Sequence, residues 1–318
     1  MDASVGTNYL VVNGVLLGVA VSLHVACVVR HVRNPLQHVR PLQTLFLRLD
    51  VLFAVFAVLF YVRVFFAENP HAVEPLAQLV FPLLEGLVIF SFFNMMVLLV
   101  GGTAAAVARM DNTTDDKHVQ GGGSTITWTS SPSKKVLDRY RHRLILFIVF
   151  KPILGAVDGW VVNHEDSATW YHKVHSVIAI GLVILTCLTF VGVLRTYLAL
   201  KTHIPPSFHL TIKFLVIKAM LIVSTFQWAI ANVILSSWST SQLYIYGTVC
   251  MVEGVAISLG FYLTFTGHEE DVPRLPATAA PFRVCSVAAI WDLLAYPLVL
   301  DPTKKTLVLV EKPTEFYI

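Results

Sequence analysis

The chain alternates between long apolar segments and short polar ones. A helix needs roughly 20 mostly apolar residues to cross the ~30 Å hydrocarbon core of a bilayer. Each apolar segment reaches that length, so the pattern predicts an all-α membrane protein, a bundle of seven transmembrane helices. The seven predicted spans are approximately 9–29, 44–66, 76–100, 142–163, 172–196, 209–235 and 243–266.

Lysine and arginine are distributed unevenly among the polar segments. The N-terminus and segments 67–75, 164–171 and 236–242 contain neither residue. The segments that follow the first, third, fifth and seventh predicted spans carry lysine or arginine instead, and the third and seventh carry both. Because cytoplasmic loops carry an excess of lysine and arginine, we expect the N-terminus outside and the C-terminus in the cytoplasm.

These limits divide the chain into a transmembrane domain, 1–267, and a cytoplasmic tail, 268–318. Segment 101–141 is polar and rich in Gly, Ser and Thr, which predicts a flexible cytoplasmic loop within the first domain. In the tail, an apolar stretch near 284–296 is too short to span a bilayer and is followed by Pro297. It predicts a short interfacial helix.

The composition indicates a protein that lies in a bilayer. It also limits the kinds of chemistry that we expect from the chain. Hydrophobic residues make up 56% of the chain and charged residues 14%, whereas a soluble domain carries about 25% charged residues. None of the four cysteines lies in a predicted outer loop, and no metal-ligand spacing or Ser/His/Asp arrangement is visible. We therefore expect no enzyme activity, catalytic residue, metal, cofactor or nucleic-acid partner.

Charged and amide side chains interrupt several predicted spans, and such groups tend to face a cavity or a partner because they are costly in hydrocarbon. Two interpretations are open for the charged groups that lie deep in their spans: a substrate cavity or structural ion pairs. The candidate substrate-binding residues are Glu85, Asn94, Lys151, Lys213, Lys218, Gln227 and Glu253.

Some of these polar groups have simpler interpretations. Lys213 lies close enough to the inner end of its span for its ammonium to reach the interface. Asn94 and Gln227 can equally serve to join helices by hydrogen bonds. Arg48 and Asp50 lie nearer an end of the second span, where an arginine commonly anchors a helix at the interface.

Four predicted spans carry short motifs that resemble one known family. Their order and spacing are similar to the third, fourth, sixth and seventh helices of the organic solute transporter alpha subunit and transmembrane protein 184 group. The resemblance covers nearly the whole membrane region and implies a seven-helix bundle with an outside N-terminus. The motifs are Phe81-Pro82-Leu83-Leu84-Glu85 with Phe92-Phe93-Asn94 and Gly101-Gly102, Phe150-Lys151-Pro152, Lys213-Phe214-Leu215 with Lys218 and Phe226-Gln227, and Cys250-Met251-Val252-Glu253.

The resemblance implies facilitated diffusion of amphipathic organic solutes, such as steroid- or bile-acid-like anions. Lys151 and Lys218 would attract the anionic head group, and Glu85 and Glu253 would pair with those lysines when no solute is bound. The implied partners are membrane lipids, the organic anion or sterol-like substrate, and either a single-span beta-type subunit or a second copy of the chain. The implied location is the plasma membrane or an endomembrane.

Two other classes of function remain open. A scaffold or trafficking protein without transport activity could use the basic loops to bind anionic lipids. A seven-helix receptor shares the topology, but no Asp/Glu-Arg-Tyr follows the third span and no Asn-Pro-x-x-Tyr closes the seventh.

Overall fold

The computed structural model describes residues 3–33, 40–68, 74–115, 132–163, 169–204, 206–227 and 239–265. Within these ranges the chain is helical and contains no strand. The helices are α1 (Ala3–Arg33), α2 (Arg40–Phe65), α3 (Glu74–Leu99), α4 (Gly102–Asp115), α5 (Pro132–Asn163), α6 (Thr169–Leu200), the 3-10 turns η3 (Lys201–His203) and η4 (Pro206–Phe208), α7 (Leu210–Leu221), the π-helical segment η5 (Ile222–Gln227) and α9 (Thr240–Phe265).

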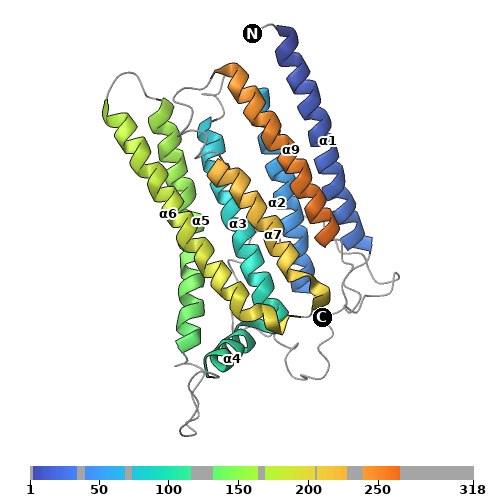
Figure 1. Cartoon of the computed structure of the whole chain (residues 1–318), viewed down its shortest axis with the longest axis vertical. Coiled ribbons are helices and arrows are strands. Elements are labelled where there is room, and N and C mark those ends of the chain that lie inside the picture. The colour runs from blue at the N-terminus through green and yellow to red at the C-terminus, as the bar shows by residue number, and fades with distance from the viewer. Residues whose placement is uncertain are drawn as a thin grey trace.

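The long helices lie side by side, and α4 lies across one end of the bundle (Figure 1). Helix α1 packs against α2 and α9, while α5 packs against α3 and α6. Helix α3 contacts α2, α5, α6 and α7, so it occupies the centre. The bundle thus has two groups, α1–α2–α9 and α3–α5–α6, which meet where α2 contacts α3.

Five of the described helices are long and apolar enough to cross a membrane: Gly6–His31, Leu45–Phe65, Leu76–Leu99, Ser176–His203 and Thr240–Phe265. The all-α membrane class is therefore confirmed. The other two predicted spans correspond to α5 and α7. Helix α5 carries charges along its length, and regular α-helix ends in α7 after 12 residues. The count of seven stays a prediction.

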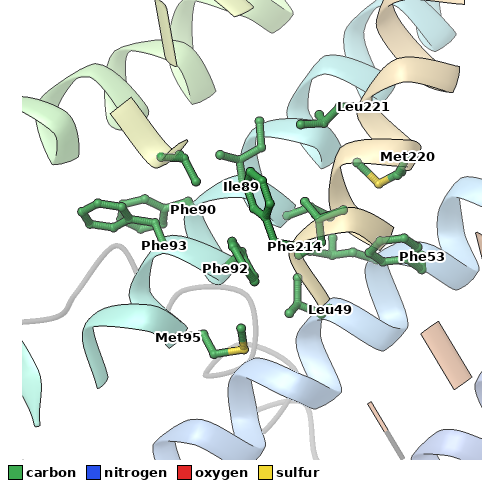
Figure 2. Packing of buried hydrophobic residues seen from close by; sticks show 14 of the residues in the cluster. Leu49, Phe53, Ile89, Phe90, Phe92, Phe93, Met95, Phe214, Met220 and Leu221 are labelled. Atoms are coloured by element: carbon green, nitrogen blue, oxygen red, sulfur yellow. The ribbon is translucent and has the colours of Figure 1, made fainter. Parts of the chain in front are cut away.

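The central position of α3 follows from its sequence. From Phe81 to Leu99 apolar residues lie on every side of the helix, and a helix with apolar residues all round must be covered all round. Figure 2 shows Phe92 of this helix beside side chains of α2 and α7, with Phe90 and Phe93 on another side of α3. All three phenylalanines are at most 1% exposed, so they form the middle of the hydrophobic core.

The prediction of a flexible loop over 101–141 was wrong at both of its ends. Gly101 and Gly102 have φ of 97° and 90°, a left-handed conformation that glycine adopts without steric cost. These two residues turn the chain sharply after α3, and α4 begins at once. Helix α5 begins at Pro132, a residue suited to the first turn of a helix. Residues 116–131 lie outside the described part.

Helix α4 is attached to the end of the bundle. Arg109 Nη1 donates a hydrogen bond to His203 O at 3.1 Å, which joins α4 to the turn after α6. Partial burial lowers the pKa of the Arg109 guanidinium, because its charged form loses contact with water. The predicted tail, 268–318, with its interfacial helix near 284–296, lies outside the described residues.

Candidate functional site

A buried ion pair joins the central helix to α5. The Lys151 ammonium donates to Glu85 Oε2, and the two residues are 3% and 2% exposed. The ammonium also lies 4.9 Å from the centre of the Phe147 ring, one turn earlier on α5. Two of the candidate residues therefore meet, and Glu85 rather than Glu253 is the carboxylate that pairs with Lys151.

Small residues allow the two helices to approach closely on both sides of this pair. A Cβ added to Gly86 would lie 2.8 Å from Ile148 Cγ1, and one added to Gly155 would lie 2.2 Å from the backbone oxygen of Gln78. Neither position admits a larger side chain without movement of the neighbouring helix. The ion pair is thus enclosed by tight backbone packing.

Asn94 lies on the opposite side of α3 from Glu85. Nine residues separate them, and at about 100° per residue they point in opposite directions. Asn94 is 1% exposed, and neither of its amide atoms has a hydrogen-bond partner within the described part of the chain. The hydroxyls of Ser91 on α3 and Thr189 on α6 are also buried and without a partner there. Asn94 and Ser91 thus place buried polar atoms on the side of α3 away from Glu85, and Thr189 adds one on α6.

Lys213 is enclosed by aromatic rings, which corrects the interpretation that its ammonium reaches the interface. It is 0% exposed and donates a hydrogen bond to Phe208 O at 2.7 Å. Its ammonium lies 3.9 Å from the centre of the Phe208 ring, 5.5 Å from that of Phe46 and 5.4 Å from that of Phe265. Cation–π contacts and a backbone carbonyl thus stabilise this charge inside the bundle.

The remaining three candidates do not join the ion pair. Lys218 is exposed on α7, and no ion pair among the described residues includes it. Gln227 ends the π-helical segment and is half-buried. Glu253 on α9 is half-buried, and its Oε2 is buried without a hydrogen-bond partner in the described chain. Arg63 of α2 and Glu253 each lie within electrostatic reach of Cys250.

A second buried polar group joins α1, α2 and α9, and the sequence interpretation missed it. His24 Nδ1 lies 2.6 Å from Asp50 Oδ1, and His24 Nε2 lies 3.0 Å from Ser258 Oγ. Asp50 is fully buried although it lies near one end of its span. This Ser/His/Asp group is not visible along the sequence, because tertiary packing brings together three residues that are far apart in it.

One signal for this group is present in the sequence. Asn13, His24 and His31 are separated by 11 and 7 residues, spacings that place all three on one face of a helix. That face meets α9 throughout. Asn13 Nδ2 donates to Thr248 Oγ1 at 2.9 Å, and His31 Nε2 donates to Phe265 O at 2.6 Å. Tyr9 stacks on Tyr244 at 5.4 Å between ring centres.

These observations define a multi-pass α-helical membrane protein whose interior holds paired charges. A family model described as Organic solute transporter Ostalpha matches residues 9–269, most of the chain. The chain therefore belongs to the organic solute transporter alpha family. The same comparisons found no match to a curated protein or to a solved structure.

Proposed function

We propose that this protein carries amphipathic organic anions, of the steroid- or bile-acid-like class, across its membrane by facilitated diffusion. The observation that supports the proposal best is the buried Lys151–Glu85 pair between α3 and α5. A lysine kept charged inside an apolar bundle is a ready counter-charge for an anionic head group, and intramembrane charges are commonly functional.

The proposed site extends from this pair around the central helix. The apolar body of the solute would lie against the aromatic side chains of α3, α6 and α7, where Phe214 stacks with Phe190 and Tyr197 at 5.7 and 4.6 Å between ring centres. Hydroxyl or keto groups of the solute would bond to Asn94, whose amide is buried without a partner in the described chain. Apolar walls with a few placed polar groups are typical of small-molecule sites.

The other candidate residues take lesser parts in this proposal. Lys218, exposed on α7, would attract anions from the bundle surface toward the interior. Gln227 and Glu253 would border the path beside the π-helical segment, since such segments frequently occur at functional sites. Lys213, already bonded to a carbonyl and three rings, would hold the inner end together.

The proposal also includes the arrangement in the membrane. Seven spans, an outside N-terminus and a cytoplasmic C-terminus are supported by the absence of lysine and arginine from segments 67–75, 164–171 and 236–242. A single-span beta-type subunit or a second copy of the chain would be the partner, and either the plasma membrane or an endomembrane the location. A scaffold without transport activity is the second candidate, favoured by the basic segment 132–143 at the start of α5.

The test is transport by the purified chain in liposomes, with labelled sterol sulfates and bile acids. We expect saturable uptake that stops when the concentrations on both sides become equal. Lys151→Met should abolish uptake, but it leaves Glu85 unpaired and would also reduce stability. The decisive variant is therefore Lys151→Met with Glu85→Gln, which removes both charges.

The double variant separates a binding role of Lys151 from a structural one. If Lys151 binds the solute, the double variant is folded but does not transport, because the counter-charge of the anion is missing. Full transport by the folded double variant would show that the pair is only structural. Absence of uptake by the wild-type chain for every solute, with and without a co-reconstituted single-span subunit, would favour the scaffold.

A further inference from the structure

The group formed by His24, Asp50 and Ser258 takes no part in the proposed solute site. It lies on α1, α2 and α9, whereas the ion pair lies between α3 and α5. The three residues are at most 2% exposed. The His24 ring also lies against Phe53 and Phe261, with ring centres 6.2 and 5.6 Å apart. The imidazole is thus surrounded by apolar side chains except at its two nitrogens.

The hydrogen bonds of this group determine how many protons it holds. Ser258 Oγ donates its single hydrogen to Gly254 O at 2.8 Å. The 3.0 Å bond between Ser258 Oγ and His24 Nε2 must then be donated by Nε2. The 2.6 Å contact between Nδ1 and Asp50 Oδ1 requires a second proton, located on either atom. The group therefore holds one proton more than a neutral imidazole beside a carboxylate.

We propose that His24, Asp50 and Ser258 form a proton-binding site, and that the bound proton holds α1 against α2 and α9. With this proton the group is electrically neutral, either as imidazolium and carboxylate or as imidazole and carboxylic acid. Without it, a net negative charge remains in a buried site where the weak thiol donor Cys27 supplies a further hydrogen bond to Asp50. Ser258 can then no longer donate to Gly254 while Nε2 is also satisfied. A buried charge without compensation is strongly unfavourable.

The order Ser–His–Asp also occurs in hydrolases, but it has a different use here. A nucleophilic serine donates its hydrogen to the histidine, whereas Ser258 donates to a carbonyl of its own helix. The serine is also 2% exposed, so a substrate has no access to its oxygen. The geometry therefore favours proton binding over acyl transfer.

Other titratable and charged groups on the surrounding helices do not replace this proton. The side chain of Arg48 points about 200° away from that of Asp50 around the axis of α2. Lys213 of α7 is enclosed by its own three aromatic rings, and Glu85 of α3 is neutralised by Lys151. The full set on the packed faces is Cys27 and His31 on α1, Arg48 and Arg63 on α2, Glu85 on α3, Lys213 on α7, and Tyr244, Tyr246, Cys250 and Glu253 on α9.

The site predicts a defined dependence of stability on pH. Between about pH 4.5 and 6, an unfolded chain also holds one proton on these residues, since histidine titrates near 6.5 and aspartate near 3.9. Above about pH 6.5 the unfolded chain loses that proton while the folded chain keeps it. Stability must then fall with rising pH, by up to about tenfold in the folded-to-unfolded ratio per pH unit for one proton.

The experiment measures the thermal unfolding midpoint of the full chain in lipid nanodiscs from about pH 4.5 to about pH 9. We expect a flat region followed by a decline for the wild-type chain. His24→Gln with Asp50→Asn removes the proton site without leaving a charge, so this decline should disappear. His31→Gln is the matched control, because His31 lies on the same face of α1 and donates to the Phe265 carbonyl. The unfolding midpoint of this control should still decline with rising pH.

Two outcomes would overturn the proposal: a wild-type midpoint that does not change with pH, or an equal decline in the double variant. Should the double variant not fold, Asp50→Asn alone replaces it, because His24 can then be neutral without leaving a buried charge. An undiminished decline in that variant would contradict the site. No solute enters these measurements, so their failure is distinct from failure of transport. We expect solute flux to change over the same pH range, and this expectation rests on the proposed transport function.

Discussion

The two buried polar interfaces of this protein compensate charge in different ways. Between α3 and α5, Lys151 and Glu85 form a pair of opposite charges within tight glycine packing. Between α1, α2 and α9, His24 and Asp50 share a proton and are linked to a serine. The first interface is therefore neutral because two opposite charges meet, and the second is neutral because the group holds one shared proton.

The largest difference should appear when one carboxylate is removed from each interface. Glu85→Gln leaves the Lys151 ammonium buried without its counter-charge, which costs about 3–5 kcal/mol. Chemical unfolding in mixed micelles measures this loss, and Lys151→Met with Glu85→Gln should recover most of it. A single variant as stable as the wild-type chain would show that the ammonium finds another partner.

The packing around the ion pair gives the next effect. Gly155→Ala places a methyl group 2.2 Å from the backbone oxygen of Gln78, so α3 and α5 must separate. Overpacking of this kind costs about 1–3 kcal/mol. Gly181→Ala on α6 is the control, because nothing lies within 4 Å of the added carbon. Equal stability of the two variants would contradict the close approach of α3 and α5.

A smaller effect is expected from the equivalent change in the second interface. Asp50→Asn allows His24 to become neutral, so no charge is left uncompensated. The loss is that of a weakened hydrogen bond, about 1 kcal/mol. If Asp50→Asn lowers the free energy of unfolding as much as Glu85→Gln does in the same assay, the two interfaces do not compensate charge in different ways.

The smallest effect should come from Lys218→Met, outside both interfaces. Lys218 is exposed and forms no ion pair among the described residues, so the change in stability should stay within about 0.5 kcal/mol. Reduced uptake by this stable variant would support a role in attracting the anion. Unchanged uptake would remove Lys218 from the proposed transport path.

The sequence alone predicted the features that depend on composition along one helix. The apolar runs predicted the membrane class, because a bilayer requires long helices with their backbone hydrogen bonds satisfied internally. The depth of Lys151 and Glu85 predicted that they need a partner. The glycines at 101 and 102 could have predicted the turn before α4, since adjacent glycines commonly mark a turn.

What the sequence could not decide is which faces meet. Lys151 had two glutamates within reach at similar depth, and only the packing of α3 on α5 selected Glu85. His24 and Ser258 are 234 residues apart, and no local pattern relates them. Tertiary structure also enclosed Lys213 in aromatic rings and left Lys218 exposed, although both lie on one short helix. The physical reason is that helix periodicity fixes which side chains share a face, while the partner of that face is fixed only by the arrangement of the whole bundle.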